Sequence, residues 1–292
     1  MKVKAELVID AKATLGEGPC WDSEKHLLYW VDIIEKKVHI HNPKTKSNQS
    51  IDVAHLPGAA VVRDSGGLVL ATQNGFYTLD EKTKELTLIE DPESDRPHNR
   101  FNDGKCDPAG RFWAGTMEVV EKEPTGSLYV LDTDLTVKKV LSDITISNGL
   151  AWSSDNKTMY YIDSPTKQVA AFDYDLESGQ LSNKRIVVTI PEGEGIPDGM
   201  TIDAEDMLWV AQWGGYKVSK WNPQTGEKIG EVSVPAKQVT SCVFAGEQLD
   251  ELYITSARRG LDEEELETYP QSGGVFRVKT DVKGGKTFSF KG

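Results

Sequence analysis

The apolar positions of the chain form short runs that recur along its length. Each copy begins with a small or polar residue and glycine, continues with an apolar run and a polar turn, and ends with an apolar or aromatic triplet. The copies start at Gly18, Gly58, Gly104, Gly149, Gly199 and Ser241. Their starts are 40 to 50 residues apart, and a period of this size indicates a repeat architecture.

A third apolar segment, and usually a fourth, follows each triplet. Polar turns such as residues 64–67 (DSGG) and 107–110 (DPAG) separate the segments. Four short strands with their turns occupy about 40 to 45 residues. We therefore predict an all-β fold: a six-bladed β-propeller with four antiparallel strands in each blade, forming one domain over residues 1–292.

Two further segments complete this prediction. The sixth copy lacks a clear fourth strand, while residues 5–10 (AELVID) form an apolar run without a partner of their own. We predict that residues 5–10 pair with the last blade and close the ring. Helical periodicity is nearly absent, and residues 261–266 (LDEEEL) are predicted to form a short helical turn in an exposed loop.

Residues at the same position of each repeat should meet, because the first strand of every propeller blade lines the central channel in the same direction. Most copies place an oxygen-bearing side chain just before the repeat start: Glu17, Pro57, Asp103 preceded by Asn102, Asn148, Asp198 and Thr240. Several carboxylates at one end of a channel would repel one another and would be costly to bury unpaired. A divalent cation would neutralise them, and oxygen ligands suit Ca²⁺, Mg²⁺ or Mn²⁺, although Zn²⁺ also accepts carboxylates.

A purely structural explanation exists for the same pattern. Asn and Asp make side-chain turn bonds at strand starts, and glycine follows them for backbone reasons. Four copies in phase, one of them with the poor turn residue Glu17, favour the metal site.

Charge and composition exclude several classes of function. The chain has 46 acidic and 33 basic residues, so its formal charge is −13, and neither nucleic acid nor a membrane surface is an expected partner. Residues 1–10 lack the apolar stretch of a signal peptide, which predicts a cytoplasmic protein. The three cysteines are far apart and are expected to be free buried thiols: Cys20, Cys106 and Cys242. The histidines show no catalytic arrangement and are expected at the surface or in loops: His26, His39, His41, His55 and His98.

Short stretches spread over nearly the whole chain carry a family resemblance. They are residues 15–19 (LGEGP), 99–105 (NRFNDGK), 112–117 (FWAGTM), 146–150 (ISNGL), 160–164 (YYIDS), 196–200 (IPDGM) and 252–257 (LYITSA). In these stretches the sequence resembles the family of gluconolactonase, regucalcin (senescence marker protein) and luciferin-regenerating enzyme.

The resemblance implies a six-bladed propeller with one catalytic divalent ion, held by Glu17, Asn148 and Asp198. It also implies that Asp198 serves as ligand and general base. Ca²⁺ is the expected ion, with Mg²⁺, Mn²⁺ and Zn²⁺ as alternatives.

The resemblance further implies that Arg100 and Asn102 contact the hydroxyls and carbonyl of the substrate. Relatives often place an acidic substrate contact in the loop after Met117. This sequence offers Glu118 or Glu121 for that role, or neither, because the register of the loop departs from the family pattern.

The expected function is hydrolysis of a sugar lactone of the aldonolactone or gluconolactone type by a metal-activated water, carried out by a monomer on a small-molecule substrate. Two alternatives stay open. One is a metal-dependent organophosphate hydrolase, and the other is a calcium-binding or interaction propeller without turnover.

Overall fold

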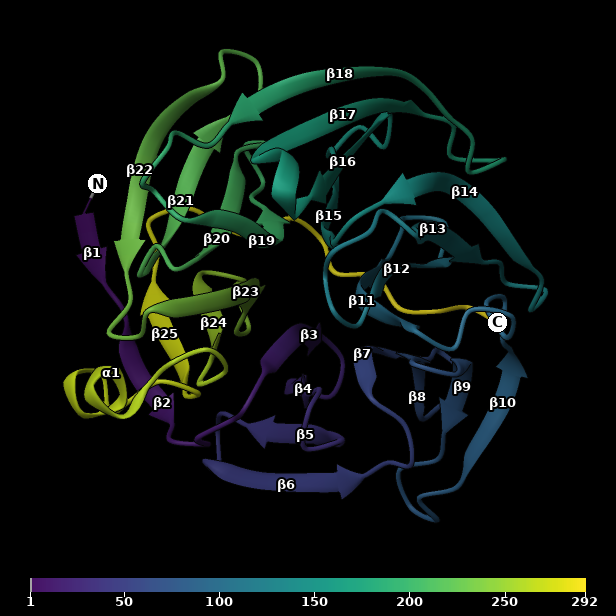
Figure 1. The fold of residues 1–292 in the computed structure, drawn as a ribbon, viewed down its shortest axis with the longest axis horizontal. Helices are drawn as coiled ribbons and strands as arrows, with labels where there is room; N and C mark the ends of the chain where they lie inside the picture. Colours follow the sequence, from purple (N-terminus) through teal and green to yellow (C-terminus); the bar gives the residue numbers. More distant parts are fainter. Residues whose placement is uncertain (1) are drawn as a thin grey trace.

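The computed structural model describes residues 2–292, and the regular secondary structure of this part of the chain is almost entirely β-strand (Figure 1). Four sheets have four antiparallel strands each. In chain order they are β3 (Gly16–Asp22), β4 (Leu27–Asp32), β5 (Lys37–Asn42) and β6 (Ser47–Asp52); β7 (Pro57–Val62), β8 (Leu68–Thr72), β9 (Gly75–Leu79) and β10 (Leu86–Glu90); β11 (Asn99–Cys106), β12 (Phe112–Glu118), β13 (Gly126–Leu131) and β14 (Val137–Ile144); and β15 (Ser147–Trp152), β16 (Thr158–Asp163), β17 (Gln168–Tyr174) and β18 (Leu181–Thr189).

The remaining strands form one nine-stranded sheet. It contains β19 (Ile196–Ile202), β20 (Leu208–Trp213), β21 (Lys217–Asn222), β22 (Glu227–Ser233), β23 (Gln238–Ala245), β24 (Glu251–Ala257), β25 (Val275–Lys279), β1 (Lys2–Lys4) and β2 (Glu6–Ile9). The pair Trp213 and Gln238 joins β20 to β23 and so merges the fifth and sixth sequence copies into one sheet. The prediction of an all-β, propeller-like fold is confirmed, although the last two copies do not form separate sheets.

The first strand of each copy lies on the inside of the ring (Figure 1). Each inner strand contacts the next, from β3 through β7, β11, β15, β19 and β23 back to β3. The repeat glycines permit this close approach: a Cβ on Gly58 would lie 2.3 Å from the backbone oxygen of Asn102, and one on Gly199 would lie 2.0 Å from Oγ of Ser241. Close packing of the inner strands therefore requires glycine at the starts of β7 and β19.

The N-terminal segment closes the ring as predicted. Strand β2 pairs antiparallel with β25, with Leu7 opposite Phe276. The structure adds a pairing that the sequence pattern did not predict, because β1 runs parallel to the outer strand β22, with Val3 opposite Val232. The first residues of the chain thus bind to both halves of the nine-stranded sheet.

The two helical segments are short. A 3₁₀ turn spans Ser164–Thr166, and helix α1 spans Glu263–Thr268 without a buried residue. Asp262 and Glu265 form a reciprocal capping box at its start, which confirms the predicted exposed helical turn near residues 261–266. Among residues 2–292, no helix is both long and apolar enough to span a membrane.

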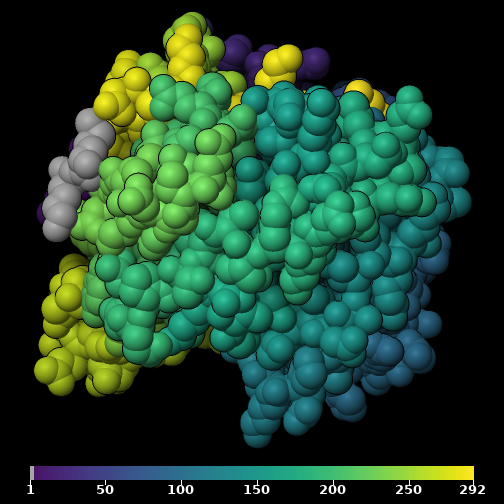
Figure 2. All heavy atoms as spheres, turned by 90° about the horizontal axis from the view of Figure 1, so that it is seen from above, coloured from purple at the N-terminus to yellow at the C-terminus, as the bar shows by residue number. Residues whose placement is uncertain are grey.

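The C-terminal tail crosses the back of the ring (Figure 1). Phe290 is fully buried, and its backbone exchanges hydrogen bonds with Val62 and Asp64, beside β7. Lys291 N donates to the carbonyl of Gly110. Residues Gly285–Phe288 of the tail line a mainly apolar cavity beside the inner strands. In the space-filling view, the yellow tail and helix α1 lie on opposite faces of the molecule (Figure 2).

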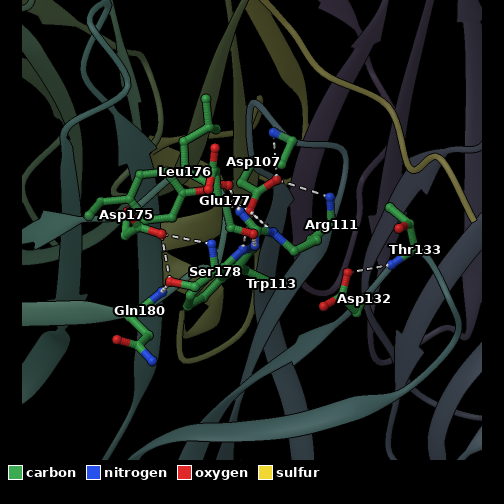
Figure 3. A network of polar contacts seen from close by, with 12 residues as sticks. Asp107, Arg111, Trp113, Asp132, Thr133, Asp175, Leu176, Glu177, Ser178 and Gln180 are labelled. Atoms are coloured by element: carbon green, nitrogen blue, oxygen red, sulfur yellow. Dashed lines mark hydrogen bonds and ion pairs between the residues drawn. The ribbon is translucent and has the colours of Figure 1, made fainter.

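A buried ion pair connects two neighbouring sheets (Figure 3). Asp107 Oδ2 accepts hydrogen bonds from Arg111 Nε (2.7 Å), Trp113 Nε1 (2.8 Å) and the Tyr174 hydroxyl (2.7 Å). Arg111 reaches across from the β11–β12 turn and donates to the carbonyls of Leu176 and Glu177 in the β17–β18 turn. Around this pair, Trp113, Trp152 and Tyr174 pack edge to face.

Removing the cation of this pair is expected to destabilise the fold. Arg111→Met should lower the free energy of unfolding by about 3 kcal/mol, because it leaves the Asp107 carboxylate buried without its counter-charge. Arg185→Met is the matched control, since the Arg185–Asp173 pair on the neighbouring β15–β18 sheet is about half exposed, and it should cost about 0.5 kcal/mol or less. Urea denaturation followed by tryptophan fluorescence measures both. Equal losses in the two variants would contradict the prediction.

Candidate active site

A β-bulge interrupts every inner strand near the start of its repeat. The register against the neighbouring strand shifts between Glu17 and Cys20, Pro57 and Ala59, Phe101 and Gly104, Ser147 and Leu150, Pro197 and Met200, and Val239 and Ser241. A bulge bends the strand and redirects side chains away from strict alternation. The residues predicted from the repeat phase lie in or beside these irregularities.

A cavity of about 130 Å³ lies at these strand starts and collects most of the predicted residues. It is lined by Glu17 from β3, Arg100 and Asn102 from β11, Asn148 from β15, and Asp198 from β19. Each of these side chains is buried, with at most 6% of the residue exposed. The structure therefore brings together, as one buried group, five of the seven site residues that the sequence analysis predicted.

The two candidate acidic residues, Glu118 and Glu121, lie in different surroundings. Glu121 lines the cavity from the exposed segment between β12 and β13, and its carboxylate pairs with Arg259 at 2.8 Å. Glu118 is not among the lining residues; its carboxylate accepts the backbone N–H groups of Lys122 and Glu123. Of the two alternatives, Glu121 lines the cavity and Glu118 does not.

Asp103 shares the repeat phase but does not line the cavity. Its Oδ1 accepts the backbone N–H of Gly104 at 2.7 Å, which is the local bond that the structural explanation expects. This bond does not distinguish Asp103 from the cavity residues, because Glu17 Oε2 accepts the backbone N–H of Gly18 in the same way (2.9 Å). Asp103 differs only in lying outside the cavity lining, and its charge still acts on Glu17.

Hydrogen bonds fix the orientation of the Asn148 amide. Its Nδ2 donates to Oγ of Ser164 (2.8 Å), and that hydroxyl donates to the carbonyl of Pro197 (2.6 Å). Asn148 Oδ1 accepts from Asn102 Nδ2 (3.1 Å), and Arg100 Nη1 donates to Asn102 Oδ1 (2.7 Å). Because the nitrogen of Asn148 is held by Ser164, its oxygen is directed toward the cavity side of the network.

Burial and neighbouring negative charge raise the pKa of both buried carboxyl groups, Glu17 and Asp198. Burial, followed by the charge of Asp103, raises the pKa of Glu17 to about 8. Burial, followed by the charge of Glu17, raises the pKa of Asp198 well above its usual range. Both carboxyl groups therefore favour the protonated, neutral form. The surrounding protein does not supply enough positive charge to stabilise both carboxylates.

The donor set fits a hard divalent cation. Two buried carboxyl groups with raised pKa values lie beside an amide oxygen in one cavity, and oxygen donors of this kind suit Ca²⁺, Mg²⁺ or Mn²⁺. Within residues 2–292, no three His, Cys, Asp or Glu side chains form a group able to hold a metal ion. The fit consequently depends on Asn148 as the third donor.

Comparison with known proteins identifies the family. Residues 15–258 match the model described as the SMP-30/gluconolactonase/LRE-like region. The chain belongs to this family. Regucalcin of Xenopus laevis is 43% identical to it, with 99% of each chain covered. A Bacillus subtilis (strain 168) protein provisionally named a sugar lactone lactonase is 40% identical, also with 99% of each covered. The solved structure of a calcium-binding protein, regucalcin, from Agrobacterium tumefaciens has a TM-score of 0.93 and 28% identity, covering 100% of this chain and 98% of that one.

Two residues at the site of this family member escaped the sequence prediction. Ser164 ends the stretch 160–164 that carries the resemblance, but nothing in the repeat phase marked it as the partner of Asn148. Arg259 lines the cavity just after the stretch 252–257. Two consecutive arginines in a strongly acidic chain were the signal that could have identified it.

The expectation for the histidines is wrong at two positions. His39 and His41 lie on strand β5; His39 stacks on Trp30 with ring centroids 3.9 Å apart, and His41 is buried with Nδ1 bonded to Asn48. Both pack as parts of the sheet, because an imidazole ring can fill a strand position. The cysteines are free as predicted, with Cys106 and Cys242 buried and Cys20 half-buried.

The raised pKa of Glu17 predicts a pH-dependent stability for the metal-free protein. In the unfolded chain this carboxyl loses its proton near its usual pKa, whereas the folded chain keeps it up to about pH 8. The free energy of unfolding should therefore fall as the pH rises from about 5 to about 8.

Glu17→Gln should flatten this fall and raise stability at pH 8, because the amide cannot ionise. Glu24→Gln, at an exposed position in the β3–β4 turn, should leave the fall as it is in the unaltered protein. Urea denaturation of chelator-treated protein at several pH values measures the slope. An unchanged slope in Glu17→Gln would show that this carboxyl does not cause it.

Proposed function

We propose that this chain hydrolyses sugar lactones of the aldonolactone type, as a single-domain propeller of six blades. One observation carries the proposal: two buried carboxyl groups, an oriented amide oxygen and a buried guanidinium face the same small cavity. The family and the name of the Bacillus subtilis relative support a lactone as the substrate.

Glu17, Asn148 and Asp198 would hold one divalent cation, with Ca²⁺ as the expected ion. The description of the Agrobacterium regucalcin as a calcium-binding protein supports this choice. When bound, such an ion would polarise the lactone carbonyl and lower the pKa of a water molecule.

Asp198 is suited to accept a proton from the attacking water. Its carboxyl is buried beside Glu17, and this surrounding raises its affinity for a proton. A carboxylate at this position can take a proton from the water during attack and return it to the departing alkoxide. Glu17 then has the role of holding the ion.

Arg100 and Asn102 would orient the substrate. Arg100 donates to Asn102 through Nη1, and Asn102 donates in turn to Asn148 and to the Ser147 carbonyl. These hydrogen bonds fix both side chains before a substrate binds. Such preorganisation lowers the entropic cost of reaching the reactive geometry. Glu121 is placed to contact the ring hydroxyls, while Glu118 is directed into its own loop.

A calcium-binding role without turnover is a second candidate, because the Agrobacterium relative is described by calcium binding rather than by an activity. A cytoplasmic location and a monomeric state remain predictions from the sequence.

Loss of either carboxylate is expected to abolish activity. Glu17→Gln and Asp198→Asn should each lower kcat by at least about 100-fold on glucono-1,5-lactone, since one removes a ligand and the other a ligand and base. Proton release above the spontaneous rate measures turnover, in metal-free protein supplied with Ca²⁺, Mg²⁺, Mn²⁺ or Zn²⁺. Circular dichroism confirms folding.

Glu24→Gln, remote from the cavity, is the control and should retain full activity. Unchanged turnover in both site variants, or in chelator-treated protein, would overturn the proposal. Calcium binding without turnover of any lactone or organophosphate ester would support the binding protein instead.

A further inference from the structure

Two guanidinium groups face the candidate active site from different depths. Arg100 is buried on β11, and Arg259 lies at the rim in the segment after β24, with 36% of its side chain exposed. They are close enough for the charge of Arg259 to contribute, after burial, to lowering the pKa of Arg100 to about 10. Two like charges directed at one cavity are costly unless an anion lies with them.

In the structure the anion that pairs with Arg259 is Glu121. It comes from the segment between β12 and β13 and pairs with Arg259 at 2.8 Å. The space-filling view shows the two sources of the pair: a yellow lobe around α1 and a blue-green lobe of the segment that follows β12 protrude from one face, with a hollow between them (Figure 2). The rim pair therefore connects two protruding segments.

The rim pair is weak enough for a ligand to replace. More than a third of each side chain is exposed, and ion pairs of this kind contribute about 0 to 1 kcal/mol. Glu121 also has a left-handed backbone (φ 63°), which is uncommon outside glycine, and its neighbours from Val119 to Thr125 are exposed. A carboxylate on a bound ligand can compete with such a partner on equal terms.

The charge of the cavity favours a singly charged anion. Three carboxyl groups and two guanidinium groups line it, giving a formal charge of −1. The divalent cation of the proposed function turns this charge to +1. A ligand carboxylate that replaces Glu121 on Arg259 leaves this charge unchanged, whereas a phosphate dianion would change it and a neutral sugar would offer Arg259 no anion.

We propose that Arg259 is a specificity-determining residue that selects lactones carrying a second acidic group, such as the monolactone of a sugar diacid. The carboxylate of the substrate takes the place of Glu121 on Arg259, while its lactone carbonyl lies deeper, at Arg100 and the carboxyl pair. This inference rests on the proposed lactonase function and assigns its substrate class.

The test compares glucaro-1,4-lactone, which bears a carboxylate, with the neutral glucono-1,5-lactone and with its 6-phosphate. The unaltered protein with Ca²⁺ should show a kcat/KM for the acid-bearing lactone at least tenfold above the other two. Arg259→Gln should lower kcat/KM for glucaro-1,4-lactone by 10- to 100-fold, mainly through KM, and should change the value for the neutral lactone less than threefold. Arg258→Gln, the neighbouring arginine outside the cavity lining, is the matched control and should preserve the preference.

Several results would overturn the inference while leaving the lactonase intact. These are a preference for the neutral lactone, a preference for the phosphorylated lactone, or equal losses on all three lactones in Arg259→Gln. If no lactone is turned over, the proposed function fails, and calorimetry then tests the recognition itself with the ring-opened acids. Tighter binding of glucarate than of gluconate, lost in Arg259→Gln, would still support anion selection by this residue; equal binding would refute it.

Discussion

The crowding of the inner strands around one axis is the constraint on which the rest of the structure depends. Neighbouring inner strands approach so closely that Gly58 and Gly199 have no room for a Cβ. A regular strand cannot satisfy both this approach and its own ladder, so the register slips at every repeat start. The bulges that result expose side chains to the axis that strict alternation would direct elsewhere. The site is therefore a product of the same crowding that closes the ring.

This origin explains why the site is held so firmly and at such cost. The residues that face the cavity belong to strands whose other faces are buried in the sheet cores, so they cannot relax away from one another. Glu17 and Asp198 consequently remain together although burial raises the pKa of both carboxyl groups and the charge of Glu17 raises that of Asp198 further. Stability is given up at the axis and recovered between the sheets, where Asp107 and Arg111 form a buried hydrogen-bond network with Trp113 and Tyr174.

Repeat phase predicted the all-β, propeller-like fold and the residues that the structure gathers in one cavity, because both follow from local pattern. The alternation of short apolar runs indicated the sheets, the unpaired run at residues 5–10 indicated the closing strand, and the position before each glycine indicated Glu17, Asn148 and Asp198. Phase alone could not exclude Asp103, whose side chain turns back to Gly104.

The rest of the site depends on contacts between distant segments, which no local pattern contains. Arg259 and Glu121 are brought together from loops that are far apart in sequence. Ser164 bonds to Asn148 from the neighbouring hairpin. The pairing of β1 with β22 joins residues 2–4 to residues 231–233. His41 was misplaced for the same reason, since its burial is decided by the packing of β5 and not by its own polarity.

The pairing of β2 with β25 has a consequence for how the protein is made. A ribosome releases β2 well before β25, so β2 waits for its partner while the strands between them are made. Contacts of such large sequence separation form slowly and leave an apolar edge open in the meantime. Final locking of the ring must therefore wait for β25, and the nascent chain is most vulnerable to aggregation just before it.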